Sequence, residues 1–273
     1  MNSIVYSTTS DNLWNSLSIF MMSAGIILIA LVLVYWFIIF KNIKVPKPFV
    51  RKTISSEIPF QNVAQKYFID KGNSSLIVEI SVKQYSTLRH INYKKSVFYI
   101  NLIGIADVSD GIRLTGMDLD FILGRAYLAN LRISSEKNYW VYFWVGYILP
   151  GFLLWSYIIS FIGGVIFLTY YNQASSQQQE GSFLSAIYNF KLYSTIPLLF
   201  YGVYIILIVL NPKVKEGLEN DYDTEMPKYV KEHYLDLYND FIDARHFSRS
   251  IKCTYHLGVG FLFNNKYLGP FAK

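Results

Sequence analysis

Three long stretches without a charged side chain constrain the fold of this chain more than any other feature of its sequence. They cover residues 17–40, 140–171 and 192–210. An α-helix rises about 1.5 Å per residue, and roughly 17–25 apolar residues cross a hydrocarbon core of about 30 Å. Each stretch is long enough, so the sequence predicts an α-helical integral membrane protein with three transmembrane helices.

The low content of charged residues agrees with this prediction. Only 16% of the residues are charged, whereas a soluble globular chain carries about 25%. Residues 1–16 contain no Lys or Arg, and the run 17–40 is longer than the roughly 7–15 apolar residues of a secretory signal peptide. We therefore expect residues 17–40 to be a permanent anchor.

The second stretch is too long for one straight helix. Pro150 lacks a backbone N–H and clashes with the preceding turn, which predicts a kink or break near this position. Within 140–171, residues 140–148 would then form an aromatic interfacial lead-in and about 149–171 the second span. The third span, 192–210, is expected to close at Asn211-Pro212.

Cations cluster directly after the first stretch. The five are Lys41, Lys44, Lys47, Arg51 and Lys52. Anionic lipid attracts a Lys or Arg near the membrane surface by about 1 kcal/mol each. We therefore predict that these five side chains contact anionic lipid headgroups.

The same cations predict the sidedness of the chain, because Lys and Arg near span ends mark the inner side of a membrane. Residues 1–16 contain no cation, and the loop 172–191 contains one, at its very end. Two cations follow soon after the third span. The N-terminus and the loop are therefore predicted outside, and residues 41–139 and 211–273 inside.

Residues 41–139 form a basic domain rather than a loop. Fifteen basic against eight acidic side chains give this segment a net charge of +7. Nucleic-acid binding would be one interpretation, but removing the five cations next to the membrane leaves only +2. We predict the membrane surface as the partner of this charge, and no nucleic acid.

Local patterns within this domain predict a small α+β fold. Amphipathic spacing indicates helices, with Gly72 as a C-cap of the first, and β-branched or aromatic runs indicate strands. In chain order the predicted elements are a helix at 57–72, strands at 75–82, 96–106 and 111–115, and a helix at 117–133.

The segment 211–273 is predicted to contain an amphipathic helix at 225–247. Its apolar face consists of Tyr234, Leu237, Tyr238 and Phe241. Large rings on one face have to be covered, either by the 41–139 domain or by a neighbouring subunit. We favour the neighbour and predict these four residues as partner contacts. The tail 255–273 fits a hairpin and an extended arm equally well.

One cluster in this helix resembles a metal site. Glu232, Asp236, Asp240 and Asp243 would share a helical face, with His233 and His246 nearby. A solvated face opposite an apolar one explains the same pattern without a metal, and we favour that interpretation. Motifs for phosphate loops, zinc hydrolases, paired cysteines or a nucleophile elbow are absent. We predict no catalytic residue, no metal and no cofactor.

The three stretches also contain no Asp, Glu, Lys, Arg or His. Such residues usually mark ion paths or proton relays, so we do not expect a pump or channel. We predict a non-catalytic structural or accessory subunit of a multi-subunit inner-membrane complex. Frequent Ile, Phe, Tyr, Asn and Lys indicate an AT-rich genome, and an Arg-rich leader is missing. Together these favour the respiratory chain or ATP synthase of the mitochondrial inner membrane.

Two alternatives stay open at this point. A component of a bacterial secretion or conjugation machine would share every feature above. A membrane-bound enzyme acting on lipid is the second, with His90 or the 232–246 cluster as its reactive groups.

Overall fold

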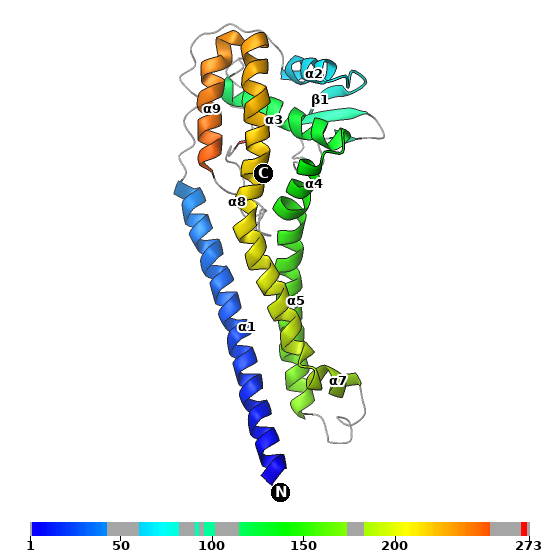
Figure 1. Ribbon diagram of the computed structural model, residues 1–273, viewed down its shortest axis with the longest axis vertical. Coiled ribbons are helices and arrows are strands. Elements are labelled where there is room, and N and C mark those ends of the chain that lie inside the picture. Colours follow the sequence, from blue (N-terminus) through cyan, green and yellow to red (C-terminus); the bar gives the residue numbers. More distant parts are fainter. Residues whose placement is uncertain are drawn as a thin grey trace. The chain divides into compact units, whose positions relative to one another are not determined.

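The computed structural model describes residues 2–42, 60–81, 91–92, 96–101, 115–173, 183–251 and 269–271 (Figure 1). The chain divides into two compact units. Unit 1 comprises Met1–Ile43 and Leu149–Ile208, and unit 2 comprises Lys44–Ile148 and Val209–Lys273. Each unit is built on its own set of contacts.

Three helices are long and apolar enough to cross a membrane, as the sequence predicts. The apolar segments lie in Leu13–Tyr35, Lys137–Gln173 and Leu192–His233. Only 22–28% of the most apolar window of each is buried within the structure. Most of their apolar surface therefore faces outward, which is the arrangement that a surrounding apolar medium favours.

The helices of unit 1 are α1 (Asn2–Asn42), α5 (Leu149–Gln173), the short α7 (Phe183–Asn189) and the beginning of α8 (Leu192–His233). Tyr157 of α5 donates a hydrogen bond of 2.5 Å to the Met22 carbonyl of α1. Gly25 permits this approach, because a Cβ there would lie 2.7 Å from the Tyr157 hydroxyl oxygen. The absence of a side chain at this position thus allows α1 and α5 to lie close together.

A second polar contact, about two helical turns before Met22, joins α1 to α7 and α8. The buried Asn15 amide donates to the Tyr188 hydroxyl of α7 at 3.1 Å and accepts from the Tyr193 hydroxyl of α8. Tyr188 also stacks on Tyr171 of α5, with ring centroids 4.3 Å apart. One asparagine and three tyrosines therefore connect all four helices.

The irregularity expected at Pro150 takes the form of a π-helical turn. Helix α4 (Lys137–Phe143) leads into η3 (Trp144–Ile148), and α5 begins directly afterwards. Pro150 has no N–H for the carbonyl of Gly146, four residues earlier. The buried Asn211 side chain donates to that carbonyl at 3.3 Å. The helical course is thereby kept, with one widened turn instead of a break.

Helix α8 does not end at Asn211-Pro212 but continues to His233. The end of the third span at residue 210 stays a prediction, because a helix can extend beyond the membrane. Beyond Pro212 the helix buries a regular stripe of side chains in unit 2: Lys215, Leu218, Glu219, Tyr222, Met226 and Val230. Packing along this stripe outweighs the local cost of proline in a helix.

Unit 2 contains the two predicted helices and two of the three predicted strands of the α+β domain, in the predicted order. In chain order, the elements of this domain are α2 (Phe60–Asp70), β1 (Ile77–Ser81), β2 (Ile91–Asn92), β3 (Val97–Asn101) and α3 (Gly116–Ile133). The sheet has the order β1-β3-β2, with β1 parallel and β2 antiparallel to β3. The two-residue strand β2 was not predicted. The strand predicted at 111–115 lies outside the described residues except for Thr115.

Both helices of this domain end or begin on the signals visible in the sequence. Gly72 has φ +78°, and Asn73 N–H donates to the Phe68 carbonyl at 2.7 Å, so α2 closes with a left-handed glycine cap. Helix α3 begins with a capping box between Thr115 and Asp118.

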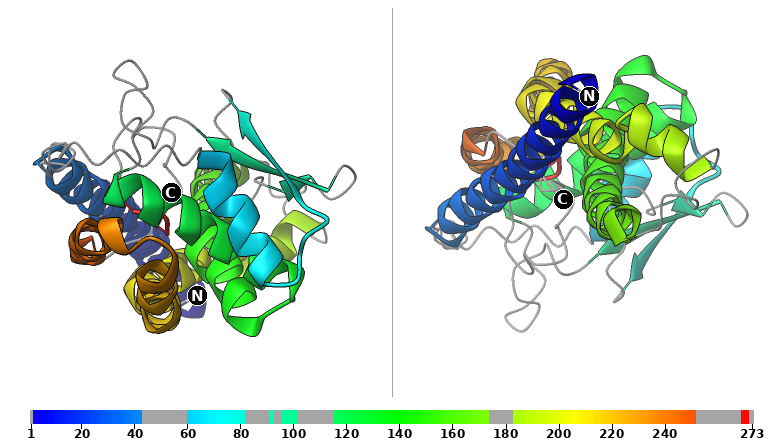
Figure 2. Two further views of the ribbon diagram at one scale, coloured as in Figure 1. Left: turned by 90° about the horizontal axis from the view of Figure 1, so that it is seen from above. Right: turned by 90° about the horizontal axis from the view of Figure 1, so that it is seen from below.

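Helix α3 is the centre of unit 2. Its residues 116–129 are all buried, and it lies between α2 on one side and α9 (Tyr238–Ser250) on the other (Figure 2). Gly116 allows the closest approach, since a Cβ there would lie 2.1 Å from the Asp240 carbonyl carbon. The core around it contains Tyr67, Phe68, Phe98, Leu123, Tyr222 and Phe241.

The predicted single helix at 225–247 is wrong. Helix α8 ends at His233, a short 3₁₀ turn follows at Leu235–Leu237, and α9 turns back beside the final part of α8 (Figure 1). The predicted tail at 255–273 is described only at residues 269–271, so neither the hairpin nor the arm is tested.

Candidate functional site

The predicted lipid-contact residues lie almost entirely outside the described part of the chain. Lys41 belongs to the final turn of α1, and its side chain is not described. Lys44, Lys47, Arg51 and Lys52 fall outside the described residues. Their contact with anionic lipid stays a prediction.

The predicted partner-contact residues lie within the core of unit 2. Tyr234, Leu237 and Phe241 are at most 6% exposed, and Tyr238 is half-buried. The turn after His233 folds α9 onto α3, so the chain itself covers this apolar face. The structure thus has the first of the two docking arrangements considered, and we correct our preference for a neighbouring subunit.

The proposed carboxylate–histidine face does not form. The turn after His233 separates Glu232 from Asp236, and both from Asp240 and Asp243 on α9. Among the described residues, no three His, Cys, Asp or Glu side chains come close enough to hold a metal ion. His90, the other candidate of the lipid-enzyme hypothesis, lies outside the residues described.

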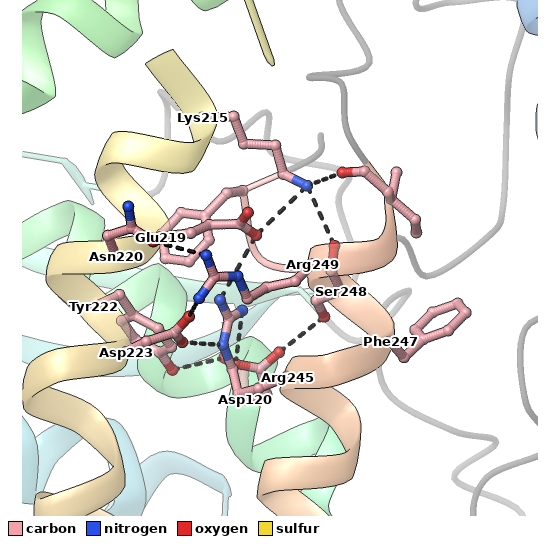
Figure 3. Close-up of polar contacts among 12 residues, drawn as sticks. Asp120, Lys215, Glu219, Asn220, Tyr222, Asp223, Arg245, Phe247, Ser248 and Arg249 are labelled. Carbon is pink, nitrogen blue, oxygen red and sulfur yellow. Dashed lines mark hydrogen bonds and ion pairs between the residues drawn. The ribbon is translucent and has the colours of Figure 1, made fainter. Parts of the chain in front are cut away.

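A different charged cluster occupies the interior of unit 2, at the junction of α3, α8 and α9 (Figure 3). Arg245 of α9 is its centre and is only 4% exposed. Its Nε donates to Asp223 Oδ1 at 2.7 Å, and its Nη1 lies 3.4 Å from Asp120 Oδ1. Its Nη2 lies 3.6 Å from Glu219 Oε1. One guanidinium therefore meets three carboxylates on two other helices.

Lys215 and Ser248 extend this network toward the end of α9. Lys215 is buried, and its Nζ donates to the carbonyls of Ser248 and Ile251 and lies 3.4 Å from Glu219 Oε1. The Ser248 hydroxyl donates to Asp120 Oδ2 at 3.1 Å. The cation of α8 thus caps the C-terminal carbonyls of α9, where the negative end of the helix dipole lies.

Arg249 forms the outer edge of the network. It is 40% exposed at its side chain and donates to Asp223 Oδ2 at 2.9 Å and to Asn220 Oδ1 at 2.7 Å. With Arg249 included, three cations face three carboxylates, so the network is neutral overall: Lys215, Arg245 and Arg249 against Asp120, Glu219 and Asp223.

Burial and charge shift two pKa values in this network. Burial raises the pKa of Glu219 above its ordinary value, against the opposing effects of Lys215 and Arg245. Burial by itself lowers the pKa of Arg245, but Asp120 and the hydrogen bond to Asp223 more than reverse this and raise it. Arg245 is therefore fixed in its charged form. Glu219 is the group whose charged form burial disfavours.

Aromatic rings shield the central cation from water. The Arg245 guanidinium carbon lies 4.8 Å from the ring centroid of Tyr222 and 5.6 Å from that of Phe271. The Tyr222 hydroxyl donates to the Asp120 carbonyl at 3.3 Å. Cation–π contact and exclusion of water both strengthen the ion pairs of Arg245.

Sequence reasoning missed this network because charged residues at helical spacing normally face solvent. A signal was present, since Lys215, Glu219 and Asp223 follow one another at intervals of four, as do Arg245 and Arg249. Asp120 also lies next to the predicted apolar face of α3. Acids at one helical spacing on α8 and arginines at the same spacing on α9 are consistent with ion pairs between the two helices.

We call this network the clamp, because its buried ion pairs hold α3, α8 and α9 together. Each carboxylate of the network lies beside a cation, and the network joins α3 to the consecutive helices α8 and α9, which lie much later in the sequence. No known family description matches this chain, and no curated protein or solved structure is significantly similar to it. Its function has to be argued from its own residues.

Proposed function

We propose that this chain is a non-catalytic structural or accessory subunit of a multi-subunit inner-membrane complex. The observation that carries the proposal is the internal pairing of charge in unit 2. Asp120, Glu219 and Arg245 are buried, and both carboxylates face the Arg245 guanidinium. Catalysis needs groups that meet a substrate or exchange protons with it, whereas these groups fix the relative positions of α3, α8 and α9.

The outward-facing apolar helices support the joining role. Exposed large side chains on them include Phe20, Leu31, Phe152, Ile159, Leu199 and Val209. In a bilayer this surface contacts lipid and the helices of other subunits, because the spans bring no Asp, Glu, Lys, Arg or His with them. Such spans serve as anchors and contact surfaces.

The proposal includes an orientation. The N-terminus and the loop 172–191 lie outside, and unit 2 lies on the inner side, where the cations at 41–52 meet anionic headgroups. The biased composition, rich in residues with AT-rich codons, favours the mitochondrial inner membrane and a complex of the respiratory chain or ATP synthase.

Depletion of the chain from its cells separates this role from an enzymatic one. One energy-transducing complex should fail to assemble, as seen by native electrophoresis of detergent-solubilised membranes. The complexes that remain assembled should keep their turnover number. Normal assembly of all complexes, together with loss of a single lipid conversion, would contradict the proposal and identify an enzyme.

A further inference from the structure

Residues 269–271, the sequence Gly-Pro-Phe, lie in the interior of unit 2. Phe271 is fully buried. Its ring meets the rings of Tyr127 on α3 and Tyr222 on α8 edge-on, with centroids 6.5 and 5.1 Å apart. The Arg245 guanidinium of α9 lies over the same ring at 5.6 Å. A groove formed by three helices therefore holds one aromatic side chain.

Two glycines fit this segment to the groove. A Cβ on Gly124 of α3 would lie 2.4 Å from Cβ and Cγ of Pro270, so no larger residue fits beneath the proline ring. Gly269 has φ +94°, and a Cβ there would lie 2.7 Å from Cβ of Ser248. Backbone conformation and space thus both require glycine at position 269.

The groove also contacts the main chain of the segment. The buried Tyr142 hydroxyl of α4 donates to the Phe271 carbonyl at 2.7 Å. One main-chain hydrogen bond, one enclosed ring and two glycine-only contacts resemble the recognition of an extended peptide, where the main chain gives affinity and a pocket gives specificity.

We propose that this groove is a recognition site for an apolar Gly-Pro-Phe peptide, and that residues 269–271 are its exchangeable resident ligand. The groove is lined by Gly124, Tyr127, Tyr142, Tyr222, Arg245 and Ser248. A separate peptide of this sequence can make every one of these contacts. Because Phe271 covers Arg245, its departure opens the ion pairs to water, and the segment acts as a latch on the clamp. This inference does not depend on the proposed function.

The first test uses the full chain in detergent and a matched pair of glycine substitutions. Gly124→Ala introduces the methyl group that meets Pro270, whereas Gly217→Ala places one on α8 where no atom lies within 4 Å. Hydrogen exchange at the amide of Phe271 should become at least tenfold faster in Gly124→Ala and stay unchanged in Gly217→Ala. Equal exchange in Gly124→Ala and the unaltered chain would overturn the proposal.

The second test measures exchange of the ligand directly. A fluorescent peptide with the sequence of residues 268–273 is titrated into Phe271→Ala and into the unaltered chain. Binding should be saturable, and at least tenfold tighter to Phe271→Ala because the resident side chain no longer competes. A control peptide with Ala in place of Phe should bind at least tenfold more weakly. Equal affinities for the two chains, or for the two peptides, would overturn the proposal.

Discussion

The Asn211 side chain donates a hydrogen bond to the carbonyl of Gly146, the oxygen to which Pro150 cannot donate. Helix α8 thus supplies a donor at the point where proline removes one from the α4–α5 segment. In unit 1, Pro197 likewise cannot donate to the Tyr193 carbonyl, and a neighbouring helix lies close to this oxygen. Gly164 of α5 approaches that carbonyl so closely that a Cβ would lie 2.4 Å from its oxygen. At Pro150 and Pro197, a neighbouring helix therefore approaches the carbonyl that the proline cannot serve.

Replacing Asn211 by Leu should lower the free energy of unfolding by about 0.5–1.5 kcal/mol, the net contribution of one intramolecular hydrogen bond. The loss should be smaller in a Pro150→Ala background, where residue 150 regains an N–H for Gly146. A double-mutant cycle measured by denaturant unfolding in detergent tests this coupling. Strictly additive losses would show that Asn211 does not compensate for the proline.

Removal of the central cation should destabilise unit 2 severely. Arg245→Leu leaves Asp120, Glu219 and Asp223 without their shared partner, and breaking a buried pair in this way costs roughly 3–5 kcal/mol. Arg249→Leu is the matched control, since its side chain is 40% exposed and such pairs contribute about 1 kcal/mol or less. Equal losses in the two variants would mean that the network does not act as a buried clamp.

The raised pKa of Glu219 predicts a pH dependence of stability. Its folded state binds the proton more tightly than the unfolded chain, so the free energy of unfolding should fall as the pH rises from about 4.5 through the folded pKa. Glu219→Gln lacks this contribution. The unfolding free energy of the unaltered chain minus that of Glu219→Gln should therefore decrease as the pH rises. If this value, unaltered chain minus variant, instead increases with pH, the result would contradict the buried environment of Glu219.

The orientation can be tested by cysteine labelling in a Cys253→Ser background. Cysteine at Ser176 should react with a membrane-impermeant maleimide from the outside of intact vesicles. Cysteine at Ser86 should react only after the membrane is opened, because the cations at 41–52 hold that segment inside. The reverse pattern would invert the placement of both inner segments.

Local signals made part of the fold predictable. The C-cap at Gly72 and the apolar spacing of Leu119, Ile122 and Leu123 require only neighbours in sequence, and α2 and α3 were predicted within a few residues. The two-residue strand β2 has no such pattern, because it is specified by its pairing with β3. The continuation of α8 past Pro212 likewise depends on a stripe whose burial only the folded unit reveals.

The charged cluster was harder to predict than the apolar core. Hydrophobic side chains at helical spacing have one favourable location, whereas Asp120 or Arg245 may face water or a buried partner with the same local pattern. The turn at Tyr234 decides between these, since it brings α9 back to α3 and α8. The metal hypothesis failed for the same reason, because it assumed one uninterrupted helix through residues 232–246.

Native mass spectrometry tests the central claim, membership of a multi-subunit complex, most directly. The tagged chain is released from its own membrane in mild detergent and measured intact. The account predicts assemblies heavier than the 31.7 kDa chain, which on activation release subunits of the respiratory chain or ATP synthase at fixed stoichiometry. A chain that is found only alone, or only with copies of itself, would contradict the claim.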